Sequence, residues 1–237
     1  MNSPADRPLP QWLAVVQGNS HQRRGWFQGS RLLHQEVWVG NPPVDWTQEL
    51  WWLGVAGAAP SSARVITLPD VPLRNLYSSL GLDRAMGLWE ATCRWGWPLL
   101  LVDAGTALTF TAGQAGAFAG GAILPGWACQ ARALHQFTAA LPQVDPLPAA
   151  PPEGIPRWAN TTAEAIRSGI TYGLQATIRD FWQDWSRQYP QSQLVITGGD
   201  APILLRGLGI PTVHHAPDLL LQGISRFRAQ NIADFSQ

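Results

Sequence analysis

The chain has 237 residues, of which 46% are hydrophobic and only 14% are charged, and its 16 basic residues balance its 16 acidic ones. The balance lacks the basic excess of proteins that bind nucleic acids or membrane surfaces. Its two cysteines lack CxxC spacing, which argues against a zinc site or a disulfide framework.

Short apolar runs dominate the first part of the chain and predict strands, because each is brief and ends near Gly, Pro or Asn. A helix over 84–94 and a fully buried strand over 99–102 follow. The Gly-rich stretch 116–125 predicts a strand or a bulge where backbones approach closely. The four early runs are WLAVV at 12–16, EVWVG at 36–40, WWLGVAG at 51–57 and RVITL at 64–68.

The remainder of the chain is predicted to be mainly helical. A helix over 127–140 precedes an extended loop, 142–156, which contains six prolines. Thr161 and Glu164 have the spacing of a capping box at the start of a long helix, 162–188. One stripe of that helix is apolar at spacings of three or four residues. The predicted stripe consists of Ile166, Ile170, Leu174, Ile178, Phe181 and Trp185.

A strand over 194–197, a short helix and a last helix over 217–230 complete the predicted elements. The N-terminal sequence MNSPADRPLPQW has no apolar core of signal-peptide length. No apolar run approaches the roughly 18 residues of a membrane span. We therefore expect a cytoplasmic protein that interacts with neither membranes nor nucleic acids.

An internal repeat relates LAVVQGNSH, residues 13–21, to LLVDAGTAL, residues 100–108. The alignment pairs Val16 with Asp103, Gly18 with Gly105 and Asn19 with Thr106. Both segments are apolar strands that run into a Gly turn with small polar residues. The repeat therefore predicts a duplicated half-domain.

These turns have the chemistry of a phosphate site. Gly lets backbone N–H groups approach phosphate oxygens, and a carboxylate at the strand end can hold a cation that neutralises phosphate charge. A third Gly-rich turn, TGGD at 197–200, opens a helix, whose N-terminus favours anions. The alternative for each turn is a tight connection that only needs positive φ.

Five segments, in order, resemble the type III pantothenate kinases, a family of the actin-like, sugar-kinase-like ATPase superfamily. The resemblance implies an α/β fold of two duplicated ribonuclease-H-like halves, with mixed sheets flanked by helices, which we place at residues 1–97 and 98–237. The segments are GNS at 18–20, LGLDR at 80–84, DAGTALTF at 103–110, GGAILPGW with TAALPQV at 120–127 and 138–144, and TTAEAIRSGI with TGGD at 161–170 and 197–200.

The resemblance implies a role for each residue of the GLDR segment. Asp83 would be the catalytic base that takes the proton from the primary hydroxyl of pantothenate. Gly81, Leu82, Asp83 and Arg84 would bind this substrate, and the Arg84 guanidinium is suited to pair with its carboxylate. From spacing alone, Asp83 and Arg84 would instead be a helix N-cap with a solvated charge behind it.

The same resemblance assigns residues to the nucleotide and to the cations. Asp103 would bind a monovalent cation, K⁺ or NH₄⁺, and Thr106 would contact the ATP phosphates; the alternative for Asp103 is a turn-capping carboxylate. Thr162 would contact pantothenate across a homodimer interface at the active site, or would only cap the helix. The other predicted nucleotide contacts are Gly18, Asn19, Ser20, Gly198 and Gly199, with a divalent cation such as Mg²⁺ carried on ATP.

The implied reaction is in-line transfer of the ATP γ-phosphate to pantothenate, the first step of coenzyme A biosynthesis. One departure from the family stands at the end of the first strand, where the usual aspartate is replaced by Val16, which cannot ligate a metal. Two alternatives therefore stay open. One is a catalytically impaired regulatory or ligand-binding relative of the same fold, and the other is a kinase for another small alcohol.

Overall fold

The first sheet has five strands in the order β3-β2-β1-β4-β5, with β1 antiparallel to β2 and parallel to β4. β1 is central and is buried at every position after its first residue, in keeping with its apolar run WLAVV, and the buried positions include the polar Gln17. The strands are β1 (Gln11–Gln17), β2 (His21–Gln28), β3 (Arg31–Val39), β4 (Leu50–Gly54) and β5 (Arg64–Val65). The computed structural model describes residues 11–40, 43–46, 48–55, 57–145 and 155–234.

The second sheet also has five strands, in the order β10-β9-β6-β7-β8, with β6 antiparallel to β7 and parallel to β9. Read from the opposite end, β8-β7-β6-β9-β10, this order matches that of the first sheet, with β6 in the place of β1. The strands are β6 (Leu99–Ala104), β7 (Ala107–Gln114), β8 (Ala117–Pro125), β9 (Gln193–Thr197) and β10 (His214–His215).

The register of the two sheets matches the repeat expected from the sequence. Val16 and Asp103 each occupy the next-to-last position at which their strand pairs with its antiparallel neighbour. The prediction of two duplicated halves with mixed sheets is thereby confirmed. Val16 is the positional equivalent of Asp103, so the first copy lacks a carboxylate at the strand end.

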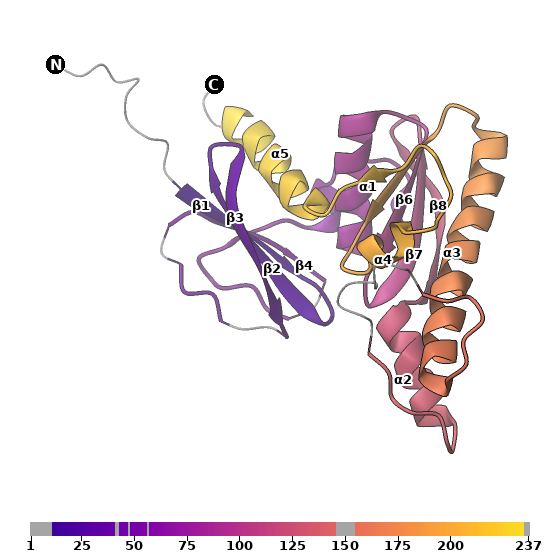
Figure 1. Ribbon diagram of the computed structural model, residues 1–237. Helices are drawn as coiled ribbons and strands as arrows, with labels where there is room; N and C mark the ends of the chain where they lie inside the picture. The colour runs from indigo at the N-terminus through magenta and orange to yellow at the C-terminus, as the bar shows by residue number, and fades with distance from the viewer. Residues whose placement is uncertain (1–10, 41–42, 47, 56, 146–154, 235–237) are drawn as a thin grey trace. The chain divides into compact units, whose positions relative to one another are not determined.

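The helices are unevenly distributed between two compact units (Figure 1). One unit contains the residues up to Glu90 together with those from Asp218 onwards, and the other contains Ala91–Pro217. The boundary predicted between residues 97 and 98 assigned the last helix to the C-terminal half, whereas α5 packs against β1 and β4 of the first sheet. The helices are α1 (Leu82–Trp95), α2 (Trp127–Phe137), α3 (Thr162–Gln188), α4 (Ala201–Leu205) and α5 (Leu219–Asp234), with a short 3-10 turn at Leu68–Asp70.

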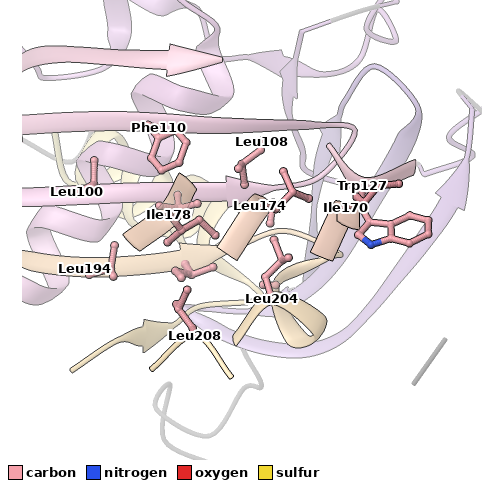
Figure 2. Close-up of a cluster of buried hydrophobic side chains, with 14 of the residues drawn as sticks. Leu100, Leu108, Phe110, Trp127, Ile170, Leu174, Ile178, Leu194, Leu204 and Leu208 are labelled. Carbon is pink, nitrogen blue, oxygen red and sulfur yellow. The ribbon is translucent and has the colours of Figure 1, made fainter. Parts of the chain in front are cut away.

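The core of the second unit lies between its sheet and helices α2, α3 and α4 (Figure 2). The predicted stripe of α3 supplies much of it, since Ile166, Ile170, Leu174 and Ile178 are buried. Phe181 stacks on Phe110 of β7, with ring centroids 4.2 Å apart. The long helix is thus anchored to the sheet over most of its length, and it packs alongside α2 (Figure 1).

The structure adds three strands that the sequence analysis did not predict, β2, β7 and the two-residue β10. The sequence of β2, HQRRGWFQ, is too polar to give an apolar run. The predicted extended loop 142–156 lies partly outside the described residues, as does the N-terminal segment used to assess a signal peptide. Among the residues that the structure describes, no helix combines the length and the hydropathy needed to cross a bilayer.

Candidate active site

Asp103 lies one residue before the end of β6, between Thr109 of β7 and Thr197 of β9 in the sheet. The strand stops at Ala104, and the chain turns through Gly105. A central strand holds its last residues firmly because ladders run along both of its sides. Asp103 therefore occupies a rigid position at the C-terminal end of the central strand of the second sheet.

Gly198, in the TGGD turn, packs directly against this strand end. It has a φ of 95°, and a Cβ atom placed there would clash with the Ala104 carbonyl oxygen and lie only 2.5 Å from Asp103 Oδ1. Asp200 N–H also donates to the Ala104 carbonyl at 2.8 Å. Only glycine fits at position 198, both by conformation and by space. Gly199, by contrast, has nothing within 4 Å of an added Cβ.

Thr106 lies in the turn after β6 and meets the start of α2. Gly126 N–H donates to the Thr106 carbonyl oxygen at 3.0 Å, and a Cβ at Gly126 would clash with the Gly105 carbonyl. Gly126 is the N-cap residue of the eleven-residue helix α2. The N-terminus of α2 therefore lies against the Gly105–Thr106 turn. The helix after TGGD, α4, has only five residues, so its dipole adds little there.

The first predicted phosphate-binding turn, residues 18–20, connects β1 to β2. Gly18 N–H donates to the His21 carbonyl oxygen at 2.9 Å, and in the turn after β6 Gly105 N–H donates to the Ala107 carbonyl oxygen at 3.0 Å. Asn19 is exposed, whereas Gly18 and Ser20 are half-buried. In both turns the first glycine donates its N–H back to a carbonyl of the turn, but the first turn is one residue longer than the second.

Val16 leaves the first turn without a strand-end carboxylate, and its neighbour Gln17 does not replace it. Val16 is 7% exposed and Gln17 is 3% exposed. The Gln17 amide nitrogen donates to the carbonyl oxygens of Gly18 at 2.8 Å and Gly40 at 3.4 Å, while its oxygen accepts from Gln22 at 3.0 Å. The polar atoms of the Gln17 side chain are therefore engaged in hydrogen bonds within the protein, and Gln17 is not placed as a cation ligand.

Asp83 lies in the first turn of α1, which begins at Leu82. Ala85 N–H donates to the Gly81 carbonyl at 3.1 Å, so Gly81, not Asp83, occupies the N-cap position. Burial raises the pKa of the Asp83 carboxyl above its ordinary value, although a hydrogen bond from Arg84 N–H and the Arg84 charge act in the opposite direction. A carboxylate with a raised pKa is better suited to accept a proton.

The other residues of the GLDR segment surround this carboxylate. A Cβ at Gly81 would lie 2.5 Å from Asp83 Oδ1, so the close approach requires glycine. Leu82 is 9% exposed and belongs to the core, which leaves only its backbone for a ligand. Arg84 is 7% exposed, and its guanidinium donates to the Tyr77 hydroxyl at 3.3 Å. Tyr77 was not among the predicted site residues.

The start of α3 separates the roles of two adjacent threonines. Thr161 is the N-cap, and its hydroxyl oxygen accepts from Glu164 N–H at 3.3 Å, which confirms the predicted cap. Thr162 lines a groove of about 390 Å³ between α2 and α3, whose other lining residues include Leu134 and Ile166. Capping by Thr161 leaves Thr162 available for a ligand in this groove.

The predicted site residues fall into separate groups. Asp103, Thr106 and Gly198 are held together at the end of β6, whereas Asp83 and Arg84 belong to α1 and Thr162 begins α3. The sequence analysis did not identify Gly126, which supports the Thr106 turn; its place immediately before a helix was the available signal.

The acidic residues fit a weakly held cation better than a tightly bound divalent metal. Within the described ranges, no three His, Cys, Asp or Glu side chains gather into a metal-binding cluster. Asp103 is a single carboxylate beside the backbone oxygens of a turn, and such oxygen donors suit a hard cation. The residues present are therefore compatible with a cation shared with a phosphate group.

Comparison with known proteins gives a consistent result. The family model described as type III pantothenate kinase matches residues 61–184. A type III pantothenate kinase of Synechococcus sp. strain JA-3-3Ab is 48% identical over 96% of this chain and 95% of its own length. One from Thermosynechococcus vestitus is 42% identical over 82% of this chain and 79% of its own.

Solved structures show similarity of fold at low sequence identity. A Campylobacter jejuni protein assigned to the Baf family of transcriptional activators aligns with a TM-score of 0.66 at 18% identity, over 93% of this chain and 99% of its own. A Sinorhizobium meliloti protein assigned as a 2-dehydro-3-deoxygalactonokinase aligns with a TM-score of 0.57 at 12% identity, over 92% and 96%.

The duplicated sheets and their paired Gly turns place the chain in the actin-like, sugar-kinase-like class of ATPase folds. Within that class, the chain belongs to the type III pantothenate kinase family. The predicted fold class and the predicted family are both confirmed. Membership of the family also confirms the prediction of an ATP-dependent pantothenate kinase. The roles of individual residues remain predictions.

Proposed function

We propose that this chain transfers the γ-phosphate of ATP to the primary hydroxyl of pantothenate, with Asp83 as the general base. The observation that carries the proposal is the Asp83 carboxylate, held at the start of a buried helix with its pKa raised by burial. Such a group can accept the hydroxyl proton as the oxygen attacks phosphorus. The neighbouring Arg84 is suited to hold the pantothenate carboxylate.

The phosphate side of the reaction is assigned to the two turns and to the TGGD segment. Thr106 and the Gly18–Ser20 turn would contact the ATP phosphates, with Gly198 and Gly199 near the nucleotide. Asp103 would hold a monovalent cation, K⁺ or NH₄⁺, and a divalent cation such as Mg²⁺ would arrive with ATP. The cations supply positive charge that offsets the charge of the transferring phosphate.

Thr162 is proposed to contact pantothenate bound by a second copy of the chain. The support is its position in an open groove, with the adjacent Thr161 already used as the helix cap. This requires a homodimer with the active site at the interface. Because ATP is a substrate, we place the enzyme in the cytoplasm.

An assay of ADP formation with pantothenate, with and without potassium, tests the activity. We expect pantothenate-dependent turnover that increases with potassium, and at least a hundredfold loss of kcat in Asp83→Asn. Absence of turnover above the no-enzyme control would reject the kinase proposal and favour a regulatory or ligand-binding relative, for which Val16 is the specific observation. Turnover with another alcohol but not with pantothenate would identify a different small-molecule kinase.

A further inference from the structure

Behind the turn at residues 18–20 runs a chain of buried and partly buried hydrogen bonds that the proposed reaction does not use directly. Arg24 Nε donates to Gln22 Oε1 at 2.5 Å, and Gln22 Nε2 donates to Gln17 Oε1 at 3.0 Å. Gln17 Nε2 in turn donates to the Gly18 carbonyl at 2.8 Å. Gln17 is 3% exposed and Gln22 is 0% exposed, so two amide side chains sit inside the unit.

Gln17 joins two parts of the sheet that meet at this turn. Its amide nitrogen contacts the carbonyl oxygens of Gly18, at 2.8 Å, and of Gly40, just after β3, at 3.4 Å. Gly40 N–H donates back to the Ser20 carbonyl at 2.8 Å. The carbonyls of Gly18 and Ser20 are thus both held by protein donors, which fixes the peptide planes of the turn.

Fixed peptide planes matter at a phosphate site. A phosphate is bound by N–H groups and repelled by carbonyl oxygens, so a turn favours it only while its carbonyls are directed elsewhere. A strand-end carboxylate can organise such a turn through a cation, but Val16 supplies none. The buried amides provide another means of holding the turn in one conformation.

The outer end of the chain is charged. Arg24 is half-buried, also donates to the Pro43 carbonyl at 2.8 Å, and lies over the Trp38 ring at 5.2 Å. Hydrogen bonds that run in one direction from a cation polarise one another. The positive charge of Arg24 therefore strengthens the bonds that end on the turn.

We propose that Gln17, Gln22 and Arg24 form a relay of positioning residues that holds the Gly18–Ser20 turn in its phosphate-binding conformation, in place of the carboxylate that Val16 lacks. The inference rests on the proposed function, because it takes ATP as the ligand of this turn. All three are proposed to act through the turn and not on the reacting atoms.

The test measures ATP binding apart from catalysis. Gln17→Met keeps the length and flexibility of the side chain but removes both the donor and the acceptor. We expect titration calorimetry with Mg-ATP, in the absence of pantothenate, to show about tenfold weaker binding, equivalent to about 1.4 kcal/mol. In steady-state kinetics the KM for ATP increases by a similar factor, whereas the KM for pantothenate stays within about twofold.

Gln35→Met is the matched control, because Gln35 is an exposed glutamine on β3 of the same sheet. It should leave ATP binding and the melting temperature unchanged. Arg24→Met, at the half-buried end of the relay, should weaken ATP binding about threefold. This variant decides the question if Gln17→Met does not fold.

Unchanged ATP affinity in a folded Gln17→Met protein would overturn the relay, as would equal losses for ATP and pantothenate. If Gln17→Met fails to fold, unchanged affinity in Arg24→Met overturns it. Failure of the proposed function gives a different result. If the wild-type protein binds ATP but does not phosphorylate pantothenate, the kinase reaction is rejected and the relay is still tested by ATP affinity. If the wild-type protein binds no ATP, both proposals are rejected.

Discussion

At the scale of single residues, the raised pKa of Asp83, with its proposed role as the base, predicts the pH dependence of the reaction. A protonated carboxyl cannot accept the substrate proton, so kcat/KM should fall as the pH drops through the Asp83 pKa. Because burial raises this pKa, the acidic limb should have its midpoint above about 4, the ordinary value for aspartate. A pH–rate profile measures it, and a midpoint at or below the ordinary value would contradict the assignment of Asp83 as a buried base.

The same shift predicts how Asp83 affects stability. Where the folded-state pKa of an acid is raised, the folded protein binds more protons than the unfolded chain, so this contribution to stability declines as the pH rises through that pKa. Asp83→Asn should therefore be as stable as the wild type or more so at pH 7, with the difference vanishing in acid. Urea unfolding at both pH values measures this; a loss of stability at pH 7 would give Asp83 a structural role instead.

Gly198 and Gly199 form a matched pair for the turn beside Asp103. Gly198→Ala places a methyl group against Asp103 Oδ1 and the Ala104 carbonyl at a positive φ, and we expect a stability loss of about 1–3 kcal/mol together with at least tenfold lower kcat/KM. Gly199→Ala meets nothing within 4 Å and should fold normally. Thermal unfolding and steady-state kinetics compare them, and equal effects would contradict the close approach at Gly198.

At the scale of elements, the start of α3 separates capping from binding. Thr161→Ala loses the bond to Glu164 N–H and should destabilise the protein by about 1 kcal/mol without changing the KM for pantothenate. Thr162→Ala should leave the melting temperature unchanged and increase that KM. Sedimentation at assay concentration completes the test: a protein that is active only as a monomer would exclude a contribution of Thr162 across subunits.

The pair Glu90–Arg226 links α1 to α5 and predicts a second effect at this scale. Arg226 Nε lies 2.6 Å from Glu90 Oε2, and the Glu90 side chain is only 3% exposed. Arg226→Met leaves a buried carboxylate without its cation and should cost about 2 kcal/mol.

The control for this pair is Arg187→Met, from an exposed pair with Asp184 at 3.8 Å. Its effect should stay within about 0.5 kcal/mol. Denaturant unfolding compares the two substitutions. A loss for Arg226→Met no larger than that of the control would show that the α1–α5 link does not stabilise the first unit.

Elements whose apolar residues recur at a regular spacing could be predicted from the sequence. Elements that form only through pairing or packing with distant parts of the chain could not. The stripe of α3 and the cap at Thr161 follow from spacing alone. β2 could not be predicted because HQRRGWFQ owes its strand conformation to pairing with β1 and β3 on either side. The packing of α5 on the first sheet is a long-range contact that no local pattern reveals.

The same division applies to the candidate site. The positions of Asp103, Thr106 and the Gly turns could be read from the sequence because each comes directly after an apolar run, while their roles stay predictions. The proposed relay behind Gly18 could not be predicted. In the sequence Gln17, Gln22 and Arg24 are ordinary polar residues, and only the β1–β2 pairing brings their side chains within hydrogen-bond distance. Tyr77 was missed for a similar reason, because its contact with Arg84 joins a loop to a helix.

At the scale of the whole molecule, two copies of one five-strand plan differ at the end of their central strand. Both copies present a Gly turn after a central strand, but only the second retains the strand-end carboxylate, Asp103. The first copy has Val16 and, behind its turn, the buried amides. We infer that the cation is organised by the second copy, while the first contributes a rigid backbone to the phosphates.

The most direct test is identification of the reaction product. Purified full-length chain is incubated with Mg-ATP, K⁺ and pantothenate, and the products are analysed by mass spectrometry. The account predicts 4′-phosphopantothenate in equal amount to the ADP released, and at least a hundredfold less of it from Asp83→Asn in the same time. ADP release without phosphopantothenate, or no reaction in the wild-type protein, would contradict it.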